Sequence, residues 1–479
     1  MSGAGTFRED FGASVVVALV ALPLCVGVAV ASGVPAELGI VTGIVGGLVT
    51  GWFRGSALQV SGPAAGLTVL VYEAVRAYGP AALGVLVLTA GVVQLALGVL
   101  GLGRWFRAIS VAVVHGMLAG IGLVLIAGQL YALGDVAAPG GTLEKVAGLG
   151  RLLGQADWAA AALGAGTVSV MVGWRRMPAR VRIVPGALVG VAAAAVVAWW
   201  LHLPVDRVEV AGVLAAVAPP AAADFAVLAS AGAVGTVVAL ALIASAETLF
   251  SAAAVDRMHD GPRTDYDREL IGQGVGNALC GLLGALPMTA VIVRSATNVE
   301  AGARTRAARI LHGGWLLVFA VCVPGLLGVV PLAALAGVLL YAGWKLLPGR
   351  AVVGLWQTHR GEAVVLVVTA GAIVATNLFE GVLVGLGLAV TKAAWDTSNV
   401  HIEQAWEGEV LRVRVAGNAS FLRLPKLLDA LDALPADRPV RIDLSGLRHF
   451  DHACLTALDG WERRRASAVP GREGAIEPG

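Results

Sequence analysis

The sequence predicts an all-α polytopic membrane domain followed by a small α/β domain. Of 479 residues, 57% are hydrophobic and only 14% are charged, and the mean hydropathy is +0.81, far above that of soluble domains. Apolar runs able to cross about 30 Å of hydrocarbon recur from residue 11 to residue 396, and dense charge follows. We therefore expect a transmembrane domain over 1–398, an α/β domain over 402–470 and a disordered tail over 471–479.

Apolar segments separated by Gly, Pro or charged residues predict fourteen membrane-spanning helices. The segments are 11–32, 36–53, 63–76, 80–100, 107–131, 157–173, 183–201, 230–254, 270–286, 289–301, 309–330, 332–347, 362–377 and 379–395. They form two sets of seven, over about 8–202 and about 224–397. Because a repeated unit with an odd number of spans inserts with opposite topology, we expect an inverted repeat.

The distribution of Lys and Arg predicts the orientation. If the N-terminus is cytoplasmic, the inside loops contain 17 Lys and Arg residues and the outside loops contain 4. Cytoplasmic loops carry the excess of positive charge in membrane proteins. We therefore expect a multi-pass protein of the cytoplasmic (inner) membrane with both termini in the cytoplasm.

Several functional classes lack support in the sequence. The chain has no Gly-Lys dipeptide, which excludes a Walker A loop, and no histidine is followed by glutamate, which excludes an HExxH zinc site. The formal net charge is only +2, so no basic excess indicates a nucleic-acid partner, and the four cysteines are widely separated. We expect neither an enzyme nor a bound cofactor.

The third and tenth segments are short and begin with helix-breaking or small residues. They start at SGPAAGLTVLV (61–71) and LPMTAVIVRSATN (286–298), in equivalent positions of the two repeats. Paired interrupted segments indicate a binding site at the membrane midplane, and the free N–H groups of a helix N-terminus favour an anion. The alternative is that Gly62, Pro63 and Pro287 are ordinary interruptions of membrane helices.

Three polar residues are candidates for that site. Glu247 lies near the middle of the eighth segment, where a charged carboxylate is costly; it is either functional or hydrogen-bonded for packing. Arg294 either contacts the anion, pairs with Glu247 or extends to the membrane surface. Ser251 follows Glu247 by four residues, so the two either share a Na⁺ or Ser251 donates to the carbonyl of Glu247. Gln94, His115 and Gln129 are expected to form interhelical hydrogen bonds.

The C-terminal region predicts a β-α-β-α unit. EVLRVRVAG (409–417) alternates like a strand, LPKLLDALDALPA (424–436) is an amphipathic helix, RPVRIDLSGL (438–447) is a buried strand with a turn, and HACLTALDGWERRR (452–465) is a second helix.

Several stretches, taken in order, resemble the SulP sulfate permease family of anion transporters, whose members carry a C-terminal STAS domain. They are ALPLCVGVAVASGVP (21–35), LQVSGPAAGLTVLV (58–71), ASAETLFSAAAVDRMHD (244–260), DRELIGQGVGNALCGLLGALP (267–287), PLAALAGVLL (331–340) and VRIDLSGLRHFDHACLTAL (440–458). The resemblance covers nearly the whole chain. It implies a seven-plus-seven inverted repeat with a core domain moving against a gate domain.

The same resemblance implies that a small inorganic anion, sulfate or bicarbonate, binds between the third and tenth helices beside the eighth. The implied site residues are Gly62, Pro63, Ala64, Ala65, Glu247, Thr289, Val291, Val293 and Arg294. It also implies contact with membrane lipid and a homodimer formed through the STAS-like domain, the membrane domain or both.

The resemblance bears on the coupling ion as well. Related bicarbonate carriers bind Na⁺ through an acid and a hydroxyl one turn later, which Glu247 and Ser251 match in kind. Glu replaces their usual Asp, and members with Glu are generally inferred to couple to H⁺. The expected function is cation-coupled anion transport, by H⁺ or Na⁺; the alternatives are an uncoupled anion channel and an anion-sensing module that signals through the tail.

The tail departs from the family pattern in two ways. It lacks the further strand and helix with which STAS domains generally continue, so we expect a shortened domain. Where related regulatory domains have a phosphorylatable Ser after Asp, this chain has Asp451 and His452. A phosphorylation switch is therefore not expected, and a role in assembly remains open.

Overall fold

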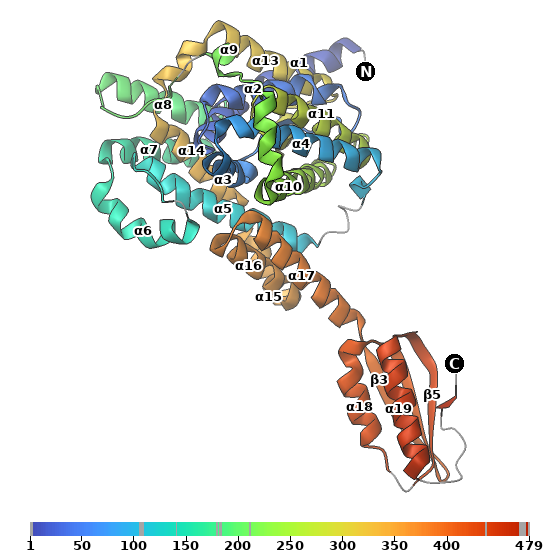
Figure 1. Ribbon diagram of the computed structural model, residues 1–479. Coiled ribbons are helices and arrows are strands. Elements are labelled where there is room, and N and C mark those ends of the chain that lie inside the picture. The colour runs from blue at the N-terminus through green and yellow to red at the C-terminus, as the bar shows by residue number, and fades with distance from the viewer. Residues whose placement is uncertain are drawn as a thin grey trace. The chain divides into compact units, whose positions relative to one another are not determined.

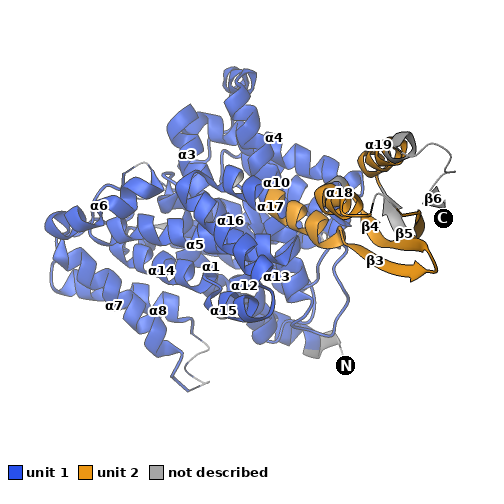
Figure 2. Ribbon diagram, turned by 90° about the horizontal axis from the view of Figure 1, so that it is seen from below, with its two compact units in different colours: residues 1–385 blue, residues 386–479 orange. Residues whose placement is uncertain are grey.

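The computed structural model describes residues 3–104, 110–139, 141–178, 181, 184–209, 212–435, 438–468 and 476–477. Within these ranges the chain forms two compact units, residues 1–385 and 386–479, which Figure 2 draws in different colours. In the described ranges the first unit is helical apart from two short strands, and the second contains a four-stranded sheet. Helix α17 (Leu378–Thr397) runs from the first unit into the second.

The helices of the first unit follow the predicted segments closely (Figure 1). In the first half they are α1 (Gly3–Ala31), α2 (Ala36–Leu48), α3 (Thr68–Tyr78), α4 (Pro80–Val99), α5 (Val111–Leu133), α6 (Thr142–Gln155), α7 (Trp158–Trp174) and α8 (Gly186–Trp200). In the second half they are α9 (Val213–Ala216), α10 (Ala231–Val255), α11 (Tyr266–Leu282), α12 (Ile292–Glu300), α13 (Ala307–Cys322), α14 (Leu332–Leu346), α15 (Gly349–Thr358) and α16 (Arg360–Ala375), followed by α17. Every predicted segment overlaps a helix; residues 107–109 and 183, which open two of the segments, lie outside the described ranges.

The number of membrane crossings is a separate question from the number of helices. Among the described residues, four helices are individually long and apolar enough to span a membrane: Thr6–Ala31, Pro80–Val99, Val111–Leu133 and Ala231–Val255. A fifth span results if α6 and α7, which are bent by 117° at their junction, cross together. Several shorter apolar helices accompany them, so the count of fourteen crossings stays a prediction.

Three helices of the first unit, α6, α9 and α15, were not predicted. In α6 polar residues such as Glu144 and Arg151 interrupt the apolar ones, and α9 has only 4 residues. Neither pattern produces the long apolar run by which a membrane segment is recognised. An amphipathic helix of this kind depends on its neighbours, and α6 packs against α5 and α16.

Helices α4 and α11 pack closely because glycines line their contact. On α4, Gly84, Gly91 and Gly98 recur every seven residues, so all three lie on one face. A Cβ on Gly84 would lie 2.8 Å from the carbonyl oxygen of Gly281 on α11, so no larger residue fits. Small residues that allow backbones to approach are the usual basis of helix packing in membranes.

The two interrupted segments meet as a short antiparallel ladder. Strand β1 (Ser61–Pro63) pairs with β2 (Met288–Ala290), and Gly62 lies opposite Thr289. A 3₁₀ turn (Ala65–Leu67) and α3 follow β1, while α12 follows β2 directly. Both half-helices therefore begin just after this two-stranded ladder.

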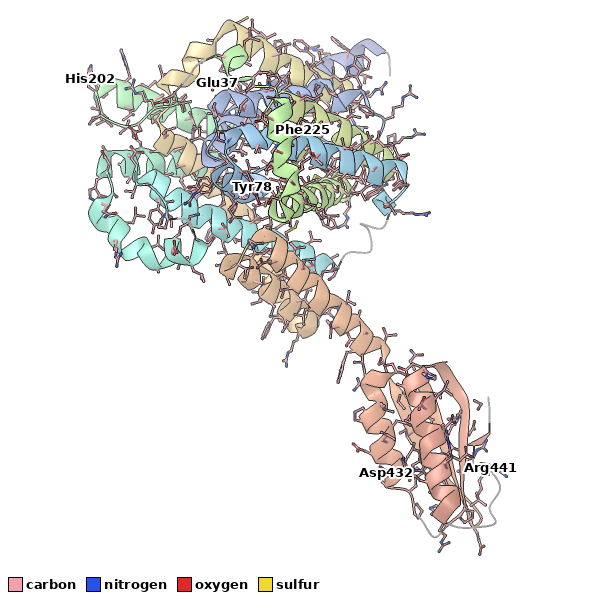
Figure 3. The ribbon with its side chains drawn as sticks, viewed as in Figure 1. Glu37, Tyr78, His202, Phe225, Asp432 and Arg441 are labelled. Carbon is pink, nitrogen blue, oxygen red and sulfur yellow. The ribbon has the colours of Figure 1, made fainter. Side chains whose placement is uncertain are left out.

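The second unit is a mixed sheet covered by two helices. Its strand order is β3 (Val400–Glu407), β4 (Val410–Ala419), β5 (Val440–Phe450) and β6 (Ile476–Glu477). Strands β3 and β4 are antiparallel, and β4 and β5 are parallel, joined through α18 (Leu424–Asp432). Helix α19 (His452–Ala468) follows β5; Figure 3 labels Asp432, the last residue of α18, and Arg441 in β5.

The predicted β-α-β-α order is present in this unit, with two additions. Strand β3 was missed because only its first four residues alternate between apolar and polar, and most of the strand is exposed. Residues 476–477 were expected to be disordered but pair with β5, which corrects that expectation for these two residues. Residues 469–475 and 478–479 lie outside the described ranges.

Candidate functional site

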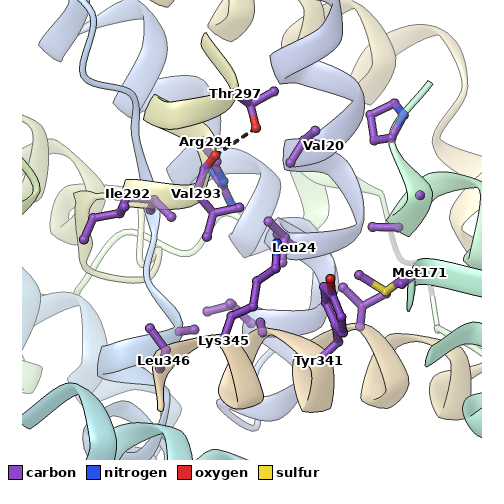
Figure 4. A pocket seen from close by; sticks show the side chains of 18 of the residues that line it. Val20, Leu24, Met171, Ile292, Val293, Arg294, Thr297, Tyr341, Lys345 and Leu346 are labelled. Carbon is purple, nitrogen blue, oxygen red and sulfur yellow. Dashed lines mark hydrogen bonds between the residues drawn. The ribbon is translucent and has the colours of Figure 1, made fainter. Parts of the chain in front are cut away.

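A cavity of about 1100 Å³ lies within the first unit beside the crossing of β1 and β2. Helix α1 lines one wall with residues four apart, which share a face of the helix: Gly12, Val16, Val20, Leu24 and Val28. Figure 4 shows Ile292, Val293 and Arg294 at the start of α12 together with Tyr341, Lys345 and Leu346 of α14. The cavity is thus bounded by the half-helix α12 and by α1 and α14.

Helix α10 fixes the backbone of β2. The backbone N–H of Ala290 donates to the hydroxyl of Thr248 (3.2 Å), and the hydroxyl of Ser251 donates to the carbonyl of Ala290 (2.9 Å). The expected alternative in which Ser251 donates to the carbonyl of Glu247 is therefore wrong, because its proton goes to β2. Both polar groups of Ala290 are satisfied by one helix, which holds the start of α12 in place.

A buried amide network supports β2 from the other side. Asn277 of α11 exchanges two hydrogen bonds with the backbone of Met288 (2.7 and 3.0 Å) and donates to Gln94 of α4 (2.7 Å). Gln94 in turn donates to Ser245 of α10 (3.2 Å). The interhelical bond predicted for Gln94 is confirmed, whereas Nδ1 of His115 has no partner among the described residues.

The residues of α11 in this network were missed by the sequence analysis. Glu269, Gln273 and Asn277 are each four residues apart in an apolar setting, so they form one polar face. Gln273 donates to the hydroxyl of Ser61 in β1 (2.6 Å), and Glu269 forms a buried ion pair with Arg309 of α13 (3.6 Å). The repeat of polar residues at intervals of four was the available signal.

Glu247 of α10 lines the cavity, and its carboxyl group lies beside Gly66 in the 3₁₀ turn that follows β1. A Cβ on Gly66 would lie 2.9 Å from each of its carboxylate oxygens, so the carboxyl group packs against the backbone of that glycine. The hydroxyl of Thr289 lies beside the carboxyl group. The Oε2 atom is buried without a hydrogen-bond partner among the described residues.

Arg294 is fully buried, and none of its three guanidinium nitrogens has a partner in the described part of the chain. Its Nη1 packs against Gly62, where no side chain would fit. The structure contradicts two readings of this residue: it forms no ion pair with Glu247 among the described residues, and its burial rules out extension to the membrane surface. A buried guanidinium without a partner is energetically costly, so Arg294 is a candidate for binding an anionic ligand.

The structure distributes the ten predicted site residues between the cavity wall and its support. Pro63, Ala65, Glu247, Val291, Val293 and Arg294 line the cavity. Gly62, Ala64, Thr289 and Ser251 are not among the lining residues. They are buried in β1, in β2, in α10 or, for Ala64, between β1 and the 3₁₀ turn. Arg175 and Lys345 also line the cavity, and the analysis of single motifs missed them because both occur in loop-flanking positions.

Two half-helices that begin beside a short β ladder and a cavity with charged residues, within a bundle of apolar helices, are typical of membrane transporters. The chain belongs to the sulfate permease family, whose sequence profile matches residues 7–369. Residues 402–469 match the profile of the Mlab STAS domain.

Known relatives agree with this assignment, and a solved structure shares the fold. The bicarbonate transporter BicA of Picosynechococcus is 26% identical over 80% of this chain and 69% of its own length. YvdB of Bacillus subtilis, described as a candidate sulfate transporter, is 28% identical over 80% of this chain and 73% of its own. The transmembrane domain of a cyanobacterial BicA shares the fold with a TM-score of 0.69 at 23% identity, covering 80% of this chain and 97% of that one.

Proposed function

We propose that the protein transports sulfate or bicarbonate across the cytoplasmic membrane by alternating access, driven by co-transported H⁺ or Na⁺. The observation that carries this proposal is the buried, unpartnered guanidinium of Arg294 at the start of α12, beside a cavity that also exposes Glu247. Membership of a family of transporters agrees with it, as does the naming of relatives for sulfate and for bicarbonate.

The anion is proposed to bind at the beginning of α12, opposite the turn that leads into α3. The first N–H groups of a helix have no partner within the helix, and the helix dipole adds positive potential there. Val291 and Val293 offer only their backbone, which suits an anion recognised through N–H groups. Arg294 adds a full positive charge to this field.

Glu247 is proposed to carry the coupling. A negative carboxylate beside the anion would repel it, so binding favours a Glu247 that is protonated or paired with Na⁺. The hydroxyl of Thr289 is a second oxygen at the carboxyl group, and the oxygen of Ser251 keeps lone pairs although its proton is used. Either ion would enter with the anion, and the requirement for neutral charge links the two fluxes.

The open cavity supports an inward-facing arrangement. It reaches Gly12, Arg175 and Lys345, which lie on the side of the membrane that the distribution of Lys and Arg assigns to the cytoplasm. The same assignment places both termini in the cytoplasm. We further propose that the functional unit is a homodimer in contact with membrane lipid, with the transporter domain over 1–398 and the STAS-like domain over 402–470.

Purified protein in liposomes tests the proposal. We expect labelled sulfate or bicarbonate to accumulate when a pH or Na⁺ gradient is imposed, and competing anions would rank the substrates. Glu247→Gln, which keeps the shape but not the charge, should still exchange anion and should lose the response to the gradient. Uptake that ignores both gradients in the unmodified protein would refute coupling.

Removing residues 401–479 separates transport from signalling. A transporter should retain flux without its tail, because the cavity and both half-helices lie in the first unit. If the truncated protein folds and flux vanishes, the tail is part of the transport cycle. Single-channel conductance above the turnover of a carrier would favour the uncoupled channel.

A further inference from the structure

A lysine of α6 is buried against the middle of α3. Lys145 is only 7% exposed, although the neighbouring Leu143 of the same helix is 57% exposed. Its Nζ lies 5.9 Å from the centroid of the Tyr72 ring on α3. The guanidinium carbon of Arg76, one turn along α3, also lies 5.9 Å from that centroid, and Glu73 lies close enough to attract Lys145. The ring of Tyr72 is therefore near two cations, and a carboxylate lies close to Lys145.

Both sides of this contact are anchored to other helices. The hydroxyl of Tyr131 in α5 donates to the backbone carbonyl of Lys145 (2.7 Å), which ties α6 to α5. Tyr72 packs against the turn after α1, since a Cβ on Gly33 would lie 3.3 Å from its Cδ2 atom. The contact of Lys145 with Tyr72 thus joins the α1–α3 side of the unit to the α5–α6 side.

These two sides have different relations to the cavity. Helix α3 continues the strand that carries Gly62 and Pro63, so its start is fixed to the candidate anion site. Helix α5 contributes Met117 and Leu118 to the opposite wall. No described residue of α3 or α6 lines the cavity, so the contact between Lys145 and Tyr72 lies outside it.

We propose that Lys145 is a latch that holds the outer end of the anion pathway shut by its contact with the face of Tyr72. This inference rests on the alternating access proposed above, in which the anion site moves relative to the wall. A cation on an aromatic face is attractive when desolvated but depends on one geometry. Sliding of α3 past α6 removes the contact and returns the ammonium group to water, which makes the latch reversible. Arg76 shares the ring from α3 itself and therefore cannot hold the two sides together.

The latch is tested by access from the outer face. Val28 lines the cavity, so we use Val28→Cys as a reporter in the full-length protein with Cys322→Ser, because Cys322 is the exposed cysteine among the four. A membrane-impermeant thiol reagent is added outside intact cells, and the rate of labelling is measured. Lys145→Met should raise this rate about tenfold, the size expected for loss of a partly desolvated cation–aromatic contact.

Matched variants distinguish the contact from general damage. Arg151→Met removes an exposed cation from the same helix and should leave the rate unchanged. Lys145→Arg and Tyr72→Phe keep the cation and the ring and should behave like the parent, whereas Tyr72→Leu should label as fast as Lys145→Met. If Lys145→Met labels no faster than Arg151→Met, the latch is refuted.

Sulfate and bicarbonate uptake is also measured in the parent reporter protein, so that refutation of the latch can be told apart from refutation of the proposed transport function. A parent that transports while Lys145→Met leaves labelling unchanged refutes only the latch. A parent that transports neither anion while Lys145→Met labels faster refutes the proposed substrates and supports the latch.

Discussion

Gly66 provides the space that the carboxyl group of Glu247 occupies: a Cβ at position 66 would lie 2.9 Å from both carboxylate oxygens. Gly62, four residues earlier, is in similar contact with the guanidinium of Arg294. The segment between the two glycines thus separates two buried groups of opposite charge that do not pair with each other. Under the proposed coupling, the carboxyl group is available to H⁺ or Na⁺ and the guanidinium to the anion.

Gly66→Ala should impair transport by forcing the carboxyl group of Glu247 out of place. Contacts between carbon and oxygen below 3.0 Å require a shift, and overpacking of this kind costs about 1–3 kcal/mol. We expect gradient-driven uptake to fall about tenfold or more by this principle. Gly235→Ala on α10, whose Cβ would meet nothing within 4 Å, is the control. Equal uptake by the two variants would show that the space at Gly66 is unnecessary.

Arg294→Met should weaken anion binding without destabilising the fold. Its guanidinium has no partner among the described residues, so removing it relieves an uncompensated buried charge. Loss of a charge-assisted contact worth about 1.5–3 kcal/mol should raise the half-saturating anion concentration about 10–100-fold. Uptake against anion concentration and thermal unfolding in detergent measure the two effects.

Arg309→Met provides the contrasting case. Arg309 is equally buried but pairs with Glu269 and donates to the carbonyl of Ser56. Its loss leaves Glu269 as a buried charge without an ion-pair partner, so the free energy of unfolding should fall by about 3–5 kcal/mol. If Arg294→Met were destabilised as much as Arg309→Met, Arg294 would have a structural role instead.

Asn277→Leu should lower the stability of the membrane domain by about 2–5 kcal/mol, because it leaves the backbone groups of Met288 and the oxygen of Gln94 without partners. Thermal unfolding of the detergent-solubilised protein measures this change. Thr236→Ala on α10, which removes only an exposed hydroxyl hydrogen bond to Gly232, should change the free energy of unfolding by no more than about 0.5 kcal/mol. A stable Asn277→Leu variant would mean that α10 alone holds β2.

Asp443→Asn should remove part of the acid sensitivity of the second unit. Hydrogen bonds from Ser445, together with Arg412, lower the pKa of the Asp443 carboxyl to about 2 from its ordinary value of 3.8. A pKa that is lowered on folding stabilises the fold above the ordinary value, and this contribution disappears as the pH falls toward 2. Pepsin cleavage of the tail between pH 4 and pH 2 should therefore rise less steeply in the variant. Identical pH profiles would show that Asp443 contributes nothing.

Local patterns predicted the elements that depend on local chemistry. Long apolar runs predicted the helices. The breaks at Gly62-Pro63 and at Pro287 predicted both half-helices, because Gly and Pro interrupt a helix through their own backbone properties. Glu247 stood out because a carboxylate is rare in an apolar segment.

Contacts between distant residues were beyond such patterns. Asn277 and Met288 meet across the turn between α11 and β2, and Gln94 joins them from nearly 200 positions away in the chain, so no periodicity connects the three. The direction of Arg294 likewise depends on Gly62, which lies in strand β1, more than 200 positions earlier in the chain. Strand β3 forms because its backbone pairs with that of β4. The exposed side chains of β3 give no sequence pattern that would predict this pairing.

The sequence by itself determined that this chain is a membrane protein with two interrupted segments and one carboxylate in an apolar helix, because hydropathy and backbone breaks are properties of neighbouring residues. Three further features follow from the folded chain alone: Ser251 bonds to β2, Glu247 and Arg294 form no ion pair with each other, and Lys145 is buried against Tyr72. Those outcomes depend on which backbones the close packing of distant helices brings together, and packing is set by the whole chain at once.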